Sequence, residues 1–390
     1  MTETSVSSPA QARPLDLLYG ETETELRAAV RSVLADKAAW RDVLTRTETE
    51  QTYDEALWHA LAAEVGVAGL LIPEALGGAG ASYREAAVVA EEMGRTVAPV
   101  PFIGSSVVAT TALLSLGEAG PLSELASGAA TAALAVPFAA GPGSRPAPTV
   151  RLDASLPGDA PDMRRLTGTV YGIADALPAD VLLVPADGVP YGLYEVRTGD
   201  GVVKEPVVSL DQTRQLCDLT LSRAPGRQIA AAEAAERAVA AALLGGAGLL
   251  ASEQLGIAER CLEMTLAYVK ERKQFARPVG GFQAIKHRLA DLWVLVTQAR
   301  AAARAAADGL VTRPGTEAEL LIALAKAACS DTAMKAAQET IQLHGGIGFT
   351  WEHPAHLFLK RAKADSIGFG TADAHRASLA GLADLPAPAP

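Results

Sequence analysis

The chain has 390 residues, of which 49% are apolar, and it carries a formal net charge of −11 with an isoelectric point near 5.1. This length and composition suffice for a large hydrophobic core and for more than one structural domain in a soluble globular protein. The acidic balance argues against a nucleic-acid-binding protein, because phosphate backbones select clustered lysine and arginine.

The cysteines and the apolar runs give no sign of secretion or of a membrane. Cys217, Cys261 and Cys329 lack the paired spacing of a zinc site or a redox motif and indicate a reducing compartment, so we expect a cytoplasmic protein. The N-terminus has no basic region followed by an apolar one, which argues against a signal peptide. The longest apolar run, residues 238–251, is too short to span a bilayer and predicts a buried helix.

The first third of the chain has the periodicity of helices. Residues 1–16 lack periodicity and are predicted to be disordered, as is the Pro- and Ala-rich tail at residues 381–390. Between residues 17 and 128, apolar side chains such as Leu26, Val30 and Leu34 recur every three or four positions. This pattern predicts an N-terminal helical domain.

The character of the sequence changes twice after residue 128. Residues 129–228 contain short β-favouring runs, such as 181–185 and 192–196, separated by Pro, Gly and Asp, and predict a middle β domain. From residue 229 to 380, long segments rich in Ala, Leu, Glu and Arg predict a C-terminal helical bundle, with helices at about 230–272, 283–310, 316–343 and 353–368. The order of helices, sheet and helices is that of an α+β protein.

One stretch in the bundle, residues 271–287, carries side chains suited to a dinucleotide. Arg272 can present a planar guanidinium to a pyrophosphate, and Phe275, one helical turn on, can cover an aromatic or ribityl face. Gln283 carries both donors and acceptors for ribose and base edges. Taken alone, Arg272 is equally consistent with an ordinary helix salt bridge.

A second stretch, residues 342–349, complements the first. Gln342 again offers donors and acceptors, and Gly345 and Gly346 let a backbone approach a ligand closely. His344 lies beside these glycines without a paired carboxylate or a second histidine at ligand spacing, so we expect no metal site.

The chain resembles the acyl-CoA dehydrogenase family over nearly its whole length, through both stretches and through the Pro-Glu-x-x-Gly-Gly segment at residues 73–78. The resemblance implies an N-terminal helical domain, a middle β domain and a C-terminal four-helix bundle. It implies an oligomeric flavoprotein of lipid metabolism that uses FAD to introduce an α,β double bond into an acyl-CoA thioester and passes electrons to an electron-transfer flavoprotein. In the family, residues of the two stretches reach the FAD held mainly by the neighbouring subunit.

The resemblance fails at the catalytic base. Residues 367–373 align with the family's terminal motif and keep Gly370 and Thr371, a position that contacts FAD in the family, but Phe369 stands where the proton-abstracting carboxylate is expected. Other family members place their Glu on the first bundle helix, where this chain has Gly246. Glu253, about 10 Å further along that helix, is the one nearby acid that we nominate. The alternative is that Glu253 is a helix-surface or interface carboxylate.

The middle domain departs from the family as well. The family's Thr-Glu-Pro-x-Ala-Gly-Ser segment, which holds flavin and substrate, corresponds to residues 135–141, and its Trp-Ile-Thr-Asn segment corresponds to residues 172–175. Hydroxyl groups are replaced by methyl groups at both places. Each lost partner would cost a buried flavin heteroatom about 1–3 kcal/mol.

Three hypotheses follow from this asymmetry. The first is that the chain pairs with a related, base-bearing subunit and completes that partner's FAD site, because the residues that would serve a neighbour's flavin match the family and those that would serve its own do not. The second is a self-sufficient homomeric dehydrogenase with a relocated base. The third is a non-redox scaffold or binding protein that kept the fold alone.

Overall fold

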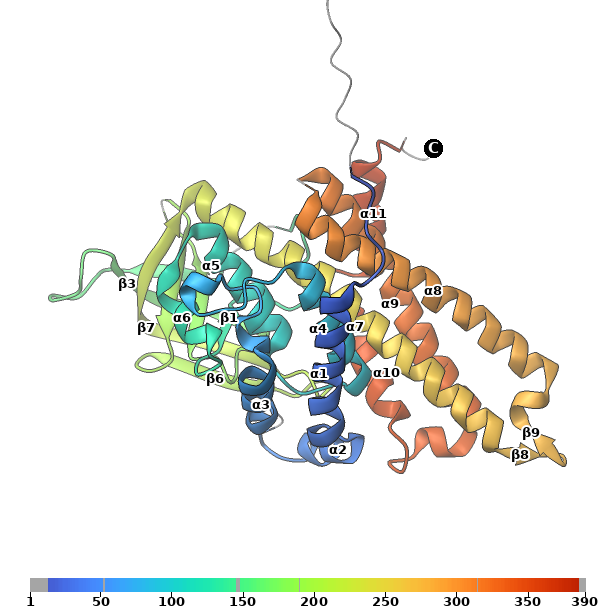
Figure 1. Cartoon of the computed structure of the whole chain (residues 1–390). Coiled ribbons are helices and arrows are strands. Elements are labelled where there is room, and N and C mark those ends of the chain that lie inside the picture. Colours follow the sequence, from blue (N-terminus) through green and yellow to red (C-terminus); the bar gives the residue numbers. More distant parts are fainter. Residues whose placement is uncertain (1–12, 52, 145–147, 189, 314, 386–390) are drawn as a thin grey trace, which may run out of the picture.

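A computed structural model describes residues 13–385 with the exception of residues 52, 145–147, 189 and 314 (Figure 1). Most of the segments predicted to be disordered, residues 1–12 and 386–390, lie outside the described residues. The described remainder of the N-terminal segment lies against the helices of residues 83–96 and 283–312, where Arg84 Nη1 donates a hydrogen bond to the carbonyl oxygen of Asp16 at 2.7 Å and the Asp16 amide donates to Asp308 at 3.3 Å. The last helix continues to Leu382, so part of the predicted tail is helical.

The N-terminal part is helical, as predicted. It comprises α1 (Glu21–Lys37), α2 (Trp40–Thr47), α3 (Glu55–Val65), α4 (Tyr83–Thr96), a π-helix (Phe102–Ala109), α5 (Thr110–Leu116) and α6 (Ala119–Ala126). Asp54 begins α3 as its N-cap, accepting a hydrogen bond from the Leu57 amide at 3.0 Å, and Gly66 ends it with a left-handed φ of 75°.

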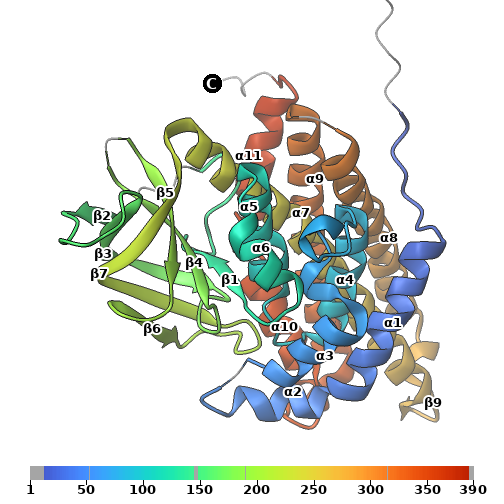
Figure 2. The same cartoon turned by 60° about the vertical axis from the view of Figure 1, so that its left-hand side comes forward.

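The middle part is a twisted sheet that stands beside the helices (Figure 2). Its strands are β1 (Ala132–Leu134), β2 (Val150–Asp153), β3 (Met163–Ala174), β4 (Val181–Ala186), β5 (Gly192–Arg197), β6 (Val202–Val207) and β7 (Leu216–Ala231). The order is β1-β4-β5-β7-β3-β2, with β6 beside β7, and the described pairings are antiparallel except for β1 with β4. The two predicted strand runs are β4 and β5.

The C-terminal part contains three long helices, α7 (Ala232–Glu271), α8 (Gln283–Thr312) and α9 (Thr316–His344), and two shorter ones, α10 (Ala355–Asp365) and α11 (Ala372–Leu382). The bounds of α7, α8, α9 and α10 agree closely with the four predicted segments, whereas no segment was predicted for α11. The hairpin of β8 (Lys273–Gln274) and β9 (Arg277–Pro278) joins α7 to α8 at the far end of the bundle (Figure 1). The predicted buried helix at residues 238–251 lies in the N-terminal half of α7. This helix is long and apolar enough to cross a membrane, but 83% of its most apolar window is buried inside the structure.

Close approach of α4 and α7 fixes the centre of the molecule. A Cβ atom built on Gly94 of α4 would lie 2.0 Å from the carbonyl oxygen of Glu253, and one built on Gly256 of α7 would lie 1.9 Å from that of Glu91. Only glycine permits this distance between the two backbones. The crossing holds Glu253 deep in the interior.

Candidate functional site

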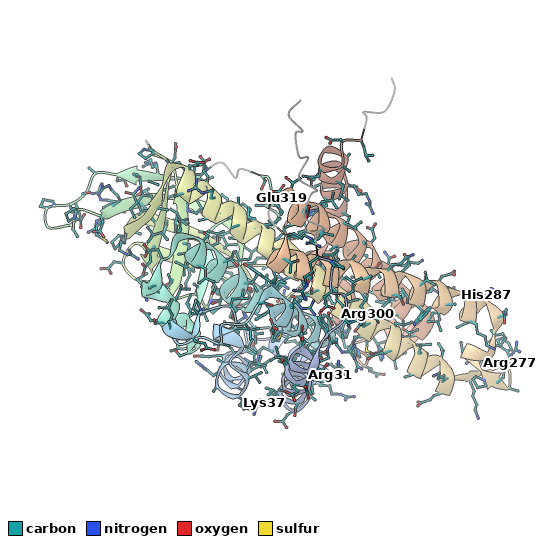
Figure 3. The ribbon with its side chains drawn as sticks, turned by 45° about the horizontal axis from the view of Figure 1, so that its top comes forward. Arg31, Lys37, Arg277, His287, Arg300 and Glu319 are labelled. Carbon is teal, nitrogen blue, oxygen red and sulfur yellow. The ribbon has the colours of Figure 1, made fainter. Side chains whose placement is uncertain are left out.

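The side chains predicted to bind a dinucleotide gather at the hairpin end of the bundle. We call this the distal surface; it consists of Arg272, Phe275, Gln283, Gln342, Gly345 and Gly346. Figure 3 shows Arg277 of the hairpin and His287 of α8 at this end of the long helices, and Glu319 of α9 toward the other end. The structure therefore brings the two sequence stretches to the same end of the molecule.

Phe275 is not one helical turn after Arg272, contrary to the prediction. The helix α7 ends at Glu271, and Phe275 and Ala276 form the two-residue loop of the β8–β9 hairpin with φ angles of 52° and 60°. Positive φ at both loop positions is what a type I′ hairpin requires, and it is unusual for residues other than Gly, Asn and Asp. The hairpin leaves the Phe275 ring 87% exposed.

A stacked pair of rings joins the two stretches. Tyr268, four residues before Arg272, stacks on His344 with ring centroids 4.4 Å apart and donates a hydrogen bond to its carbonyl oxygen at 3.2 Å. The glycines that follow His344 are consequently held beside the end of α7. Both Arg272 and Gln342 are exposed. Among the described residues, Arg272 has no ion-pair partner and the Gln342 side chain has no hydrogen-bond partner. The polar groups of both side chains are therefore available to a ligand.

Thr371, the remaining predicted cofactor residue, lies elsewhere. Its side chain accepts a hydrogen bond from the Ala374 amide and caps α11. Arg376 of the same helix pairs with Asp331 of α9. Asp331 lies fourteen positions before Gly345, which corresponds to about 21 Å of axial rise along the helix. Thr371 and the distal surface therefore belong to two different half-sites.

Phe369 fills the position that the resemblance assigns to the base. The residue is 4% exposed, has a φ of 50°, and packs edge-on against Phe138 with ring centroids 5.3 Å apart. Its amide donates to the carbonyl oxygen of Phe138 at 2.8 Å, and its carbonyl oxygen accepts from Nε2 of His375 at 2.8 Å. Contacts within the same chain therefore fix both the backbone and the ring of Phe369.

The second base position lies directly against the same ring. A Cβ atom built on Gly246 would lie 3.0 Å from Cζ of Phe369 and 2.9 Å from Cγ2 of Val108. The phenyl ring thus occupies the space that a side chain at position 246 would need. One aromatic ring therefore fills both places where the resemblance to the family expects a carboxylate.

Glu253 lies in a buried ionic cluster. Its Oε1 accepts from Nη2 of Arg214 at 2.5 Å and from Nη1 of Arg361 at 2.6 Å, and it is 2% exposed. Burial alone would raise the pKa of Glu253, but the two guanidinium groups hold it below its usual value. A carboxylate held in this way is a poor proton acceptor, so this environment disfavours the catalytic role considered for it.

Comparisons with known proteins agree with this architecture. A model of the acyl-CoA dehydrogenase N-terminal domain matches residues 20–120, and a model of the C-terminal domain matches residues 228–381. Acyl-CoA dehydrogenase IpdE2 of Mycobacterium tuberculosis is 36% identical over 348 residues, covering 88% of this chain and 91% of that protein. The chain belongs to the acyl-CoA dehydrogenase family.

Solved structures of acyl-CoA dehydrogenases share the fold. The ChsE4–ChsE5 complex of Mycobacterium tuberculosis is 26% identical with a TM-score of 0.82, covering 96% of this chain and all of that one. A variant of the Tcur3481–Tcur3483 steroid acyl-CoA dehydrogenase is 29% identical with a TM-score of 0.81, covering 93% and 98% of the two chains. The family implies an FAD-dependent oxidoreductase acting on a CH–CH bond.

FAD fits one of the two half-sites of this acyl-CoA dehydrogenase better than the other. The distal surface offers an unpaired guanidinium, an unpaired amide and two exposed glycines, a donor set suited to a pyrophosphate and a ribose. Beside Phe138, residues 135–141 offer no hydroxyl group to a ligand, although the adjoining cavity of about 550 Å³ between the sheet and α10 is also lined by Arg214 and Asp218. The loss of these hydroxyl groups makes this half-site the poorer fit for an isoalloxazine ring.

Sequence reasoning did not find the partners of Glu253. Arg214 lies before β7, 39 residues before Glu253, and Arg361 lies on α10, 108 residues after it. Asp365, also on α10, accepts a hydrogen bond from Nε of Arg214. Burial raises the pKa of Asp365 to about 8 and lowers that of Lys326, whose Nζ donates to the Asp365 carbonyl oxygen, to about 8. The one sequence signal of this buried cluster was the unusual number of charged residues within apolar segments.

Proposed function

We propose that this chain is the base-lacking subunit of a heteromeric acyl-CoA dehydrogenase. Its distal surface completes the FAD site of a related subunit, and that partner supplies the carboxylate that removes the substrate's α-proton. The electron-transfer flavoprotein reoxidises the cofactor, and the assembly works in the cytoplasm. The two solved relatives named above, one a ChsE4–ChsE5 complex and one a Tcur3481–Tcur3483 enzyme, carry two protein names each and support pairing of this kind.

The observation that carries this proposal is the contact between Phe369 and Gly246. A ring atom of Phe369 lies 3.0 Å from where the first side-chain atom of residue 246 would be. A carboxylate at position 246 would have to displace this ring, and position 369 carries the ring itself. An enzyme that lacks its base loses on the order of 10²–10⁴-fold in rate, so the chain requires a partner for efficient turnover.

The distal surface has a definite task in this assembly. When bound, FAD accepts the β-hydride of the acyl group. Arg272 would hold its pyrophosphate, Gln342 would hydrogen-bond to its ribose or base edge, and Phe275 would cover one of its faces, all from outside the subunit that carries the base. Phe275 is 87% exposed on its hairpin, which suits a side chain that contacts a neighbouring subunit rather than one that packs in the core of its own subunit.

Co-expression with a related dehydrogenase tests the proposal. The chain alone should purify with little flavin and little activity, whereas the co-expressed complex should hold one FAD for each pair of subunits and bleach when acyl-CoA is added. The absorbance ratio at 450 nm and 280 nm counts the flavin, and light scattering counts the subunits. A homomeric preparation with one FAD per chain and rapid enone formation would refute the proposal and favour a relocated base. Absence of flavin from every complex would favour a scaffold.

A further inference from the structure

A second cavity, of about 310 Å³, lies where the N-terminal helices meet the bundle. Residues of α1, α4, α7, α10 and the start of α2 form its walls, and none of the predicted cofactor residues lines it. Its volume is at the lower end of the range of small-molecule sites, so it suits a compact ligand. The apolar part of the wall includes Leu34, Ala38, Trp40, Met264 and Phe358.

The charged residues in this wall are mostly arginines. Arg31, Arg95 and Arg260 line the cavity together with one acid, Glu92. Glu92 is 2% exposed, and its two oxygens already accept hydrogen bonds from Nε and Nη2 of Arg31 at 2.9 and 2.7 Å. Nη1 of Arg27 donates to the same carboxylate at 3.3 Å. The acid in the wall is therefore engaged by other arginines and does not serve Arg260.

The guanidinium of Arg260 donates no hydrogen bond to a described residue. Its one ion-pair partner among them is Glu263, whose Oε2 lies 3.8 Å from Nη1 of Arg260, beyond hydrogen-bonding distance. The same oxygen accepts from Nη2 of Arg95 at 2.5 Å. Burial, together with the like charges of Arg95 and Arg31, lowers the pKa of Arg260. The side chain is 44% exposed at the mouth of the cavity, so an anion entering from solvent can reach it.

The ion pairs around the cavity leave one positive charge in excess. Arginines and glutamates form a closed network, whose members have no ion pair with any other described residue. Its members are Arg27, Arg31, Arg95, Arg260 and Arg300 with Glu91, Glu92, Glu259 and Glu263. Five positive charges against four negative ones leave a charge of +1. Near the end of α1, Lys37 pairs with Asp36, and these two charges cancel. A ligand with a single negative charge would balance the network, whereas a phosphate monoester, with nearly two charges at neutral pH, would exceed it.

We propose that this cavity binds a monocarboxylate with a compact apolar body. The carboxylate pairs with the guanidinium of Arg260, because the two planar groups can form parallel, charge-assisted hydrogen bonds. Nη1 of Arg31, which has no hydrogen-bond partner among the described residues, can donate another. The apolar body lies against Trp40 and Met264. This site goes beyond the proposed function and does not depend on it.

Isothermal titration calorimetry of the full-length chain with 1-naphthoate tests the proposal. We expect one site per chain, with an affinity that falls as salt is raised, because Arg260 is partly exposed. The neutral amide 1-naphthamide has nearly the same shape and should bind at least about tenfold more weakly. Equal binding of the amide and the acid would overturn the assignment of a carboxylate. Tighter binding of 1-naphthyl phosphate would overturn the assignment of a singly charged ligand.

Two pairs of variants locate the site. Arg260→Gln should weaken naphthoate binding at least about tenfold, whereas Arg237→Gln, an exposed arginine of the same helix that also pairs with a nearby glutamate, should not. Ala35→Phe places a ring in the cavity from α1 and should have the same effect, whereas Ala29→Phe, on α1 outside the cavity, should have none.

Circular dichroism checks that each variant folds, and Met264→Trp replaces Ala35→Phe if the latter does not. Undiminished binding in the folded Arg260→Gln variant or in the folded cavity-filling variant would overturn the site. Failure of the unmodified chain to bind naphthoate would refute this inference and leave the proposed function unaffected, since the latter is tested by flavin content in the co-expressed complex.

Discussion

The ring of Phe369 packs over the α-carbon of Gly246, so close that a Cβ atom on residue 246 would lie 3.0 Å from Cζ of Phe369. One residue comes from the loop before α11 and the other from the middle of α7, 123 positions apart in the chain. Together they fill the region to which the family resemblance assigns the proton-abstracting carboxylate. The consequences of this contact can be measured.

Restoring an acid at position 369 should destabilise the protein instead of activating it. Phe369→Glu would place a carboxyl group among the apolar side chains of Phe138 and Val108 and beside Gly246, in place of a ring that is 4% exposed. Burying an uncompensated polar group should cost about 2–4 kcal/mol of unfolding free energy. Urea denaturation measures this loss, and Phe369→Leu, which keeps an apolar side chain, is the control. Efficient dehydrogenation by the isolated Phe369→Glu variant would contradict the expectation.

The two neighbouring glycines of α7 should respond oppositely to alanine. Gly246→Ala introduces a methyl group at 2.9–3.0 Å from Val108 and Phe369, and overpacking of this kind costs about 1–3 kcal/mol. Gly245→Ala is the matched control, since its Cβ atom would lie 3.5 Å from Thr111 and Tyr83 and helix propensity favours alanine by about 1 kcal/mol. Thermal denaturation of both variants measures the difference. Equal unfolding midpoints would show that the Phe369 ring can move aside without a loss of stability.

Removing the guanidinium of Arg272 should lower the FAD content of the co-expressed complex without unfolding this chain. Arg272→Ala deletes a charge-assisted contact worth about 1.5–3 kcal/mol of FAD affinity. Arg237→Ala is the control, because Arg237 is exposed on α7 far from the distal surface and pairs only with Glu233 among the described residues. Flavin absorbance per complex measures the effect. An FAD content equal to that of the unmodified complex would mean that the cofactor does not bind at Arg272.

Neutralising Glu253 should damage the fold more than any surface change. Glu253→Gln leaves Arg214 and Arg361 without their shared carboxylate in an environment that is almost fully buried. Loss of one partner from a buried ion cluster costs about 3–5 kcal/mol. Glu233→Gln, an exposed acid on the same helix, is the control. A stable Glu253→Gln variant that loses turnover in the complex would revive Glu253 as a catalytic group.

Acid should weaken the structure near the distal surface. Burial lowers the pKa of His353 and His356 to about 4, below the ordinary value near 6.5. The unfolded chain therefore binds more protons in this interval, so the stability these residues contribute is present above about pH 6.5 and is lost as the pH falls toward 4. His353→Phe, which keeps a ring 4.2 Å from His344, should flatten the pH dependence. His59→Phe on the exposed face of α3 should not.

The amino-acid pattern alone determined much of the architecture. The Ala-, Leu-, Glu- and Arg-rich composition of residues 230–272 and 316–343 predicted α7 and α9 to within two residues, because helix propensity accumulates over many turns. The strand runs at 181–185 and 192–196 were equally clear, since β4 and β5 are short, β-branched and bounded by turn residues. The sequence alone also showed that position 369 carries no carboxylate.

Only the tertiary structure decided how distant residues meet. The sequence suggested that Phe275 follows Arg272 on a helix, but the hairpin closed by β8 and β9 turned it outward. It suggested that Glu253 might serve as a base, whereas Arg214 and Arg361 reach it across the chain and hold its charge. Such contacts depend on loop closure and on helix crossing angles, which no local pattern encodes. The contact of Phe369 with Gly246 belongs to this second class, and the proposed division of labour between subunits depends on it.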